Sequence, residues 1–166
     1  YSYSRDGLRS ARLLPGLREE TQYNELGLPT QVAIHSASDG QLLKWHTFAY
    51  DENDNVISVS NAACACVTQF TYDGSDNRLS MTDAAGNSIR YTYDNRRHVL
   101  THQDPAGFST TNSYDQDGNL LTTRDAMGLQ SEFTYYPNGR VATMRDQRGG
   151  LTQFAYDSFG RLTNEI

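Results

Sequence analysis

The residues best able to do chemistry in this chain are aspartates that recur at regular intervals. One set directly follows an aromatic column, and a second set lies ten residues further on; together they are Asp51, Asp73, Asp94, Asp115 and Asp157, and Asp83, Asp104, Asp125 and Asp146. Paired carboxylates can share a proton or hold a water between them. On a sheet of stacked hairpins, successive members of one set would lie roughly 10 Å apart, twice the inter-strand spacing. That separation is too large for either role, so we interpret the aspartates as turn residues.

Other catalytic and metal-binding patterns are also absent from the sequence. Asp115-Gln116-Asp117-Gly118 resembles the start of a calcium loop, but no Glu follows at its twelfth position. The histidines share no column; they are His35, His46, His98 and His102. Neither a Gly-x-Ser-x-Gly elbow nor a phosphate loop occurs. The sequence therefore predicts no catalytic, cofactor-binding or metal-ligating residue, no cofactor, and no enzyme in this segment.

The two cysteines, Cys64 and Cys66, lie two residues apart. On a strand they would point to the same face, which is a poor spacing for a disulfide and supplies only half of a metal site. We interpret them as two small residues that fill adjacent packing positions.

The composition limits the elements that can position these residues. Fewer than a fifth of the 166 residues are Leu, Ile, Val or Phe, whereas eleven are Tyr and six are Phe. This predicts a sheet packed through aromatic columns and not an aliphatic core. The net charge of −6, with scattered Lys and Arg, excludes a basic footprint for nucleic acid. No apolar run approaches the length of a membrane span.

A repeat of about 21 residues organises the chain. Its tyrosines are separated by 22 residues once and by 21 thereafter; they are Tyr50, Tyr72, Tyr93, Tyr114, Tyr135 and Tyr156. Asp follows nearly every one of them, and Gly118, Gly139 and Gly160 stand four residues after theirs. An Asp-x-x-Gly stretch is turn chemistry, because Asp bonds the backbone ahead of it and Gly accepts positive φ.

Each unit is expected to hold two short strands and two tight turns. Gln153–Tyr156 alternates polar and apolar residues with the period of a half-buried strand. Twenty-one residues leave no room for a helix. The predicted fold is therefore all-β: tandem antiparallel β-hairpin repeats that form a curved ribbon. Such an array is quasi-one-dimensional, because each repeat packs only on its neighbours.

Two regions of one continuous array are expected. Residues 1–49 hold degenerate repeats, and residues 50–166 hold regular ones. The 27-residue interval from Tyr23 to Tyr50 predicts a longer loop within His35–Gln41. Arg9–Glu20 has a helical turn as its alternative, although Pro15-Gly16 would cut it short. Because the array begins and ends inside repeats, we expect it to belong to a larger protein.

The Tyr-Asp units resemble those of the Rhs/YD-repeat family. The resemblance rests on Phe154–Leu162, Tyr91–Asp94 and Tyr23–Pro29, and it extends over nearly the whole chain. It implies that the ribbon is a fragment of a spiral β-shell or cocoon, a hollow shell of β-hairpins as in Rhs polymorphic toxins, type VI secretion effectors, insecticidal toxin complexes and teneurins. In the toxins the shell encloses a C-terminal toxic domain. No counterpart of the closing, self-cleaving region of such proteins is found here, so no catalytic residue is carried over.

The function implied is a structural segment of a toxin shell. Its partners would be the rest of its own polypeptide and secretion-system components, and its location would be secreted, or delivered by a bacterial secretion system. The alternatives are a module that binds cell-surface glycans and a teneurin-like adhesion module at the cell surface. Sugar-binding hairpin repeats tend to carry a Trp or paired Tyr in each unit, whereas Trp45 is the one Trp of this chain.

Overall fold

The computed structural model describes residues 2–3, 7–61 and 64–165 of the chain. Every regular element in those ranges is a β-strand, which confirms the all-β prediction. The chain divides into two compact units, Tyr1–Ser88 and Ile89–Ile166. Within the part of the chain that the structure describes, no helix is long and apolar enough to cross a membrane.

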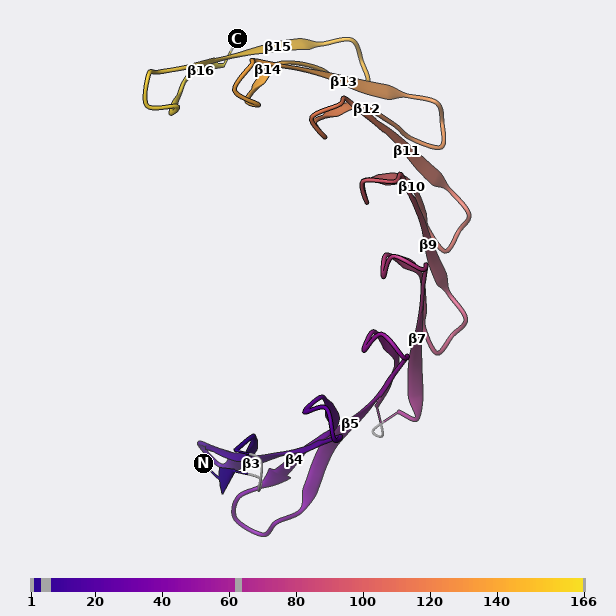
Figure 1. The fold of residues 1–166 in the computed structure, drawn as a ribbon, viewed down its shortest axis with the longest axis vertical. Helices are drawn as coiled ribbons and strands as arrows, with labels where there is room; N and C mark the ends of the chain where they lie inside the picture. The colour runs from indigo at the N-terminus through magenta and orange to yellow at the C-terminus, as the bar shows by residue number, and fades with distance from the viewer. Residues whose placement is uncertain (1, 4–6, 62–63, 166) are drawn as a thin grey trace. The chain divides into compact units, whose positions relative to one another are not determined.

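The first unit is an antiparallel meander in which each strand pairs with the next along the chain. Its strands are β1 (Ser2–Tyr3), β2 (Arg9–Leu14), β3 (Leu17–Tyr23), β4 (Pro29–Ser36), β5 (Leu42–Tyr50), β6 (Val56–Asn61), β7 (Cys66–Tyr72) and β8 (Arg78–Thr82). Figure 1 shows these strands edge to edge in a single layer.

The second unit repeats the same arrangement. Its strands are β9 (Ser88–Tyr93), β10 (Val99–Gln103), β11 (Ser109–Tyr114), β12 (Leu120–Arg124), β13 (Gln130–Tyr135), β14 (Val141–Arg145), β15 (Leu151–Tyr156) and β16 (Leu162–Glu165). Again the strands form one layer (Figure 1). The prediction of tandem antiparallel hairpins is thus confirmed in both units.

A conventional core is missing from this single-layer architecture. Ala33, at 5% exposure, is the one buried apolar side chain among the described residues. Aromatic side chains instead stay half-buried along the strands, as in β15, where partly covered and exposed residues alternate through Leu151–Tyr156. Side-chain contacts between neighbouring hairpins must therefore supply much of the packing that a second layer would otherwise provide.

The hairpin of β4 and β5 corrects one prediction. Its connection, residues 37–41, is as short as the connection 104–108 between β10 and β11. The strands take up the extra length instead, because β4 has 8 residues and β5 has 9, against 5 in β10 and 6 in β11. Additional ladder pairs satisfy backbone groups that a longer loop would have left to water.

The segment Arg9–Glu20 contains no helical turn, so that alternative is wrong. It forms β2 and the start of β3, and Leu14 pairs with Leu17 around Pro15-Gly16. Gly16 has φ 72°, which a two-residue turn with Pro at its first position requires of the residue that follows.

The interpretation of the cysteines as packing residues is also wrong. Cys64 and Cys66 form a disulfide with a Cα–Cα distance of 5.1 Å. Cys64 does not lie on a strand; it belongs to the turn before β7, and Ala65 between the cysteines has φ 52°. The chain reverses direction there, which turns the two side chains toward each other.

Candidate functional site: the contacts between repeats

An aspartate closes the turn after every repeat tyrosine from Tyr50 onward except Tyr135, which Tyr136 follows. In the turn after Tyr114, Asp115 Oδ1 accepts the backbone N–H groups of Asp117 at 2.9 Å and Asn119 at 2.8 Å. Gly118 has φ 87° and donates its N–H to the Asp115 carbonyl. The predicted role of the aspartates as turn caps is thus observed, and it recurs at Asp51, Asp73, Asp83, Asp94, Asp104, Asp125, Asp146 and Asp157.

A second column completes these turns and was not recognised in the sequence. Its residues stand five positions after the tyrosine, and we call it the five-after column. Asn119 Nδ2 donates to Asp115 Oδ2 at 2.9 Å, and His98 Nδ1 lies 2.8 Å from Asp94 Oδ2. The column also contains Asn55, Asn77 and Arg161, each bonded to its own Asp. Polar residues with a donor nitrogen recur there at the same 21-residue period, and that recurrence was the available signal.

In these turns the carboxylate oxygens are occupied as hydrogen-bond acceptors. The Asn119 side chain, followed by the Asn119 backbone N–H, holds the pKa of Asp115 below its usual range. Asn87 does the same to the pKa of Asp83, and the Arg161 backbone N–H lowers the pKa of Asp157. A general acid requires a raised pKa and a free oxygen. Asp83, Asp115 and Asp157 have lowered pKa values and bonded oxygens instead.

Four of the repeat tyrosines are seen to bond the hairpin before their own. Tyr114 donates its hydroxyl to the carbonyl oxygen of Val99 at 2.9 Å, and Tyr135 donates to that of Leu120 at 2.8 Å. Tyr50 bonds Pro29 and Tyr72 bonds Val56 in the same way. Each acceptor stands six residues after the preceding repeat tyrosine. The hydroxyl is therefore a specific bond between neighbouring repeats, which we call the tyrosine bridge.

The register of the strands explains why these carbonyls are available. The ladder between β10 and β11 runs from Gln103–Ser109 to Thr101–Thr111 and does not reach Val99. On its other side, Val99 pairs with Tyr93 past a bulge. A carbonyl beyond the end of a ladder needs another donor. Tyr114 supplies one, and Asn112 Nδ2, at 3.0 Å from the same oxygen, supplies a second.

The environment of the bridge raises the pKa of two of its tyrosines, Tyr50 and Tyr135. Desolvation, followed by the negative charge of Asp115, raises the pKa of Tyr135. Desolvation also raises the pKa of Tyr50. Both hydroxyls therefore keep their proton throughout the physiological pH range and can serve as permanent donors.

Residues of the five-after column also cover the ring of the next tyrosine. His98 stacks on Tyr114 with ring centroids 4.8 Å apart, and the Arg140 guanidinium lies 5.5 Å from the Tyr156 ring centroid. In the first unit, Asn53 and Asn55 instead reach Asp76 of the following turn at 2.9 and 2.7 Å. The same column thus closes its own turn and contacts the next one.

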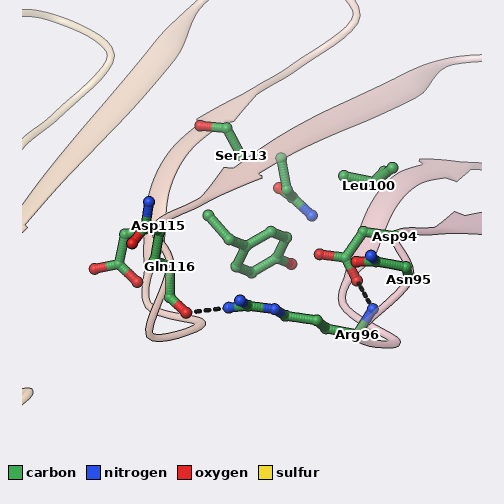
Figure 2. A pocket seen from close by; sticks show the side chains of 9 residues that line it. Asp94, Asn95, Arg96, Leu100, Ser113, Asp115 and Gln116 are labelled. Carbon is green, nitrogen blue, oxygen red and sulfur yellow. Dashed lines mark hydrogen bonds between the residues drawn. The ribbon is translucent and has the colours of Figure 1, made fainter.

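A cleft of about 680 Å³ lies between two successive turns of the second unit. Figure 2 shows Arg96 extending from its own turn across the cleft to the next, where its guanidinium bonds the Gln116 carbonyl. The carboxylates that line the cleft, Asp94 and Asp115, point back to their own turns as caps. Arg96 therefore acts as a further link between repeats.

The turns at the other ends of the strands, which precede β11 and β13, carry exposed apolar side chains. Phe108 is 62% exposed and Met127 is 83% exposed, and both line a smaller cleft of about 310 Å³. Leu129 and Leu151 are also exposed in this unit. A large exposed apolar patch marks a surface that another part of a protein or a partner covers.

The four histidines do not come together. His98 is in a turn, while His102 lies on β10 and packs on Tyr91 with ring centroids 5.2 Å apart. His35 contacts the Gly40 carbonyl and Glu20. Across the described ranges, no group of three or more His, Cys, Asp or Glu residues is arranged to hold a metal ion.

Comparisons with known proteins agree with this architecture. A family model described as RHS repeat matches residues 72–110 and 135–166. No curated protein gives a significant sequence match. A crystal structure of TcdB2-TccC3-Cdc42 has a TM-score of 0.79 at 12% identity and covers 96% of this chain and 9% of its own. A crystal structure of TcdB2-TccC3 has a TM-score of 0.73 at 14% identity, covering 89% and 9%.

A third neighbour is the Tc holotoxin pore of Photorhabdus luminescens, in a form with a TccC3 mutation. It has a TM-score of 0.53 at 15% identity and covers 93% of this chain and 11% of its own. This chain therefore spans only about a tenth of the length of these structures. At such identities the likeness concerns the fold. The family model adds that residues 72–110 and 135–166 match RHS repeats, in agreement with the Rhs/YD-repeat resemblance of the Tyr-Asp units.

Proposed function

We propose that these repeats form part of a curved β-shell that encloses the C-terminal toxic domain of an Rhs-type toxin. The observation that supports this most directly is the tyrosine bridge, one specific bond to the preceding repeat that is made by each of Tyr50, Tyr72, Tyr114 and Tyr135. A wall one layer thick needs such bonds, because it has no core to hold its repeats in order. Residues 1–49 and 50–166 would belong to one continuous wall.

The proposed context is a toxin complex or a type VI effector of a bacterium, delivered out of the producing cell. Solved neighbours that contain TccC3, one of them a Tc holotoxin pore, support the toxin-complex form. The exposed apolar residues of the second unit, Phe108 and Met127, suit a surface covered by the rest of the same polypeptide. Secretion-system components would then contact the assembled shell and not an isolated repeat.

The disposition of the tyrosines favours a shell wall over a carbohydrate-binding module. Sugar-binding repeats present free aromatic faces, whereas Tyr114 is stacked by His98 and its hydroxyl is bonded to Val99. The commitment of the Asp column to turns likewise favours a structural role over an enzymatic one.

Limited proteolysis of the full-length protein tests the proposal. We expect the segment that follows the repeats to resist digestion in the native protein. It should become sensitive when two bridges are removed together, by Tyr114→Ala and Tyr135→Ala. The variant pair Leu121→Ala and Met127→Ala, which leaves the bridges intact, is the matched control. A C-terminal segment digested equally fast in all three proteins would contradict encapsulation, and retention on a glycan array would instead support the sugar-binding module.

A further inference from the structure

The turn between β6 and β7 differs from every other turn of its type in the regular repeats. In the later repeats this position reads Asp-x-x-Gly, whereas here the aspartate is replaced by Asn61 and no glycine follows before β7. The connection, residues 62–65, is one residue shorter than the connection 83–87 between β8 and β9. β6 and β7 are each one residue longer than β8 and β9, which accounts for the 22-residue interval between Tyr50 and Tyr72. The disulfide of Cys64 and Cys66 lies at the β6–β7 turn.

The other turns of this type are closed by an aspartate carboxylate and a glycine with positive φ. In the turn after β12, Asp125 Oδ1 accepts the N–H groups of Met127 and Leu129, both at 2.9 Å. Gly128 there takes φ 82° without a side chain to obstruct it. Residues 61–66 include no carboxylate, and Ala65 has a φ of 52°. A non-glycine residue is disfavoured in that conformation.

The disulfide is also accessible. Cys64 is exposed and Cys66 is partly exposed. Thiol–disulfide exchange requires a thiolate to reach one sulfur, so exposure decides whether a small thiol can attack. The geometry points to a covalent clamp that replaces the aspartate cap and is open to solution.

We propose that the Cys64–Cys66 disulfide is a thiol–disulfide exchange site for low-molecular-weight thiols, and that its reduction loosens the end of the β6–β7 ladder at Asn61 and Cys66. The thiolate of a glutathione-type thiol attacks Cys64 Sγ, the bond to Cys66 breaks, and Cys66 leaves as a thiolate that takes up a proton. A second thiol attacks the mixed disulfide, which frees Cys64 as a thiol. Two thiols are thereby oxidised to one small disulfide, and the protein gains two electrons and two protons.

The effect of reduction is expected to be local. The disulfide encloses a single residue, so it restrains the unfolded chain little and contributes little to global stability. Its neighbour in the ladder is the pair Asn61–Cys66, at the turn end of the β6–β7 ladder. The other end is held by the bond from the Tyr72 hydroxyl to the Val56 carbonyl at 2.9 Å. Reduction should therefore loosen the turn end and leave the bridge end closed.

Thiol alkylation and hydrogen exchange on the same protein test this site. Before reduction, iodoacetamide should modify neither cysteine; after incubation with glutathione, it should modify both. Amide exchange near Asn61 and Cys66 should then accelerate by about ten-fold, as in local opening. Exchange in the β10–β11 turn, closed by Asp104 and Gly107, should be unchanged, and the melting temperature should move little. The double variant Cys64→Ser, Cys66→Ser should match the reduced protein without any thiol.

Ala65→Gly serves as the second variant, because it removes the cost of positive φ while leaving both cysteines in place. In the reduced state it should slow the exchange of the turn relative to reduced wild type. The proposal is overturned if both cysteines are alkylated without any reductant. It is equally overturned if reduction leaves exchange near Cys66 unchanged, or accelerates it to the same degree in the β10–β11 turn.

Discussion

The hydroxyl of Tyr114 lies 2.9 Å from the carbonyl oxygen of Val99, fifteen residues earlier in the chain. Val99 pairs with Tyr93, the tyrosine of the preceding repeat. One bond therefore connects the tyrosine of one repeat to the ladder partner of the tyrosine in the preceding repeat. It explains why the repeat keeps tyrosine there when phenylalanine would fill the same volume.

Removing this hydroxyl should destabilise the chain measurably. We expect Tyr114→Phe to lower the free energy of unfolding by about 1 kcal/mol, the usual net worth of one hydrogen bond. Tyr114→Ala should cost about 3 kcal/mol, because the ring is lost as well. Tyr136→Phe is the control, since the Tyr136 hydroxyl also bonds a carbonyl, that of Phe154, but is solvent-exposed. Urea unfolding measures all three. Equal costs for Tyr114→Phe and Tyr136→Phe would show that the bridge contributes nothing special.

Two glycines with the same backbone conformation should respond differently to alanine. Gly107 has φ 89° and open space around it, so Gly107→Ala should cost about 1 kcal/mol from backbone strain alone. Gly118 has φ 87°, and a Cβ there would lie 2.8 Å from His98 Nε2. Gly118→Ala should therefore cost more, about 2 kcal/mol. Adding His98→Asn should remove the excess, and a double-mutant cycle with no coupling between the two sites would refute the clash.

Arg97 offers a stabilising substitution. It has φ 70°, and glycine stands at the equivalent position in the later repeats. Arg97→Gly should raise the free energy of unfolding by about 0.5–1 kcal/mol, because it removes the left-handed strain of a residue with a Cβ. Asp76 has a similar φ of 62° but accepts bonds from Asn53 and Asn55. Asp76→Gly should thus give a smaller gain or a loss, and thermal melts of both variants compare them.

Acid should weaken the aspartate turns. The pKa of Asp115 is lowered in the folded chain, first by the Asn119 side chain and then by its backbone N–H. A carboxylate with a depressed folded pKa stabilises the fold above its unfolded pKa of about 4, and this contribution is lost as the pH falls through the folded value. The melting-temperature difference between wild type and Asp115→Asn should therefore shrink below pH of about 4. A difference that stays constant down to pH of about 2 would contradict this linkage.

Much of the fold is predictable because its signals are local. An aspartate, the residues two and four positions on, and a glycine make up one turn, so five consecutive residues encode its hydrogen bonds. The 21-residue period then sets the strands between turns. For the same reason, the role of the aspartates as turn caps could be predicted from the sequence alone. The five-after column was equally local, but its mixture of Asn, His and Arg concealed a shared role.

The long-range features required the tertiary structure. Nothing within one repeat shows that Tyr114 will meet Val99, because that contact depends on a bulge and on a ladder that ends before the turn. The six extra residues before Tyr50 lengthened two strands and not a loop, since paired backbone groups are more stable than unpaired ones. The Cys64–Cys66 bond depended on a local chain reversal that the strand pattern did not reveal. The sequence by itself determined the repeat and its turns; the register between repeats decided how they hold one another.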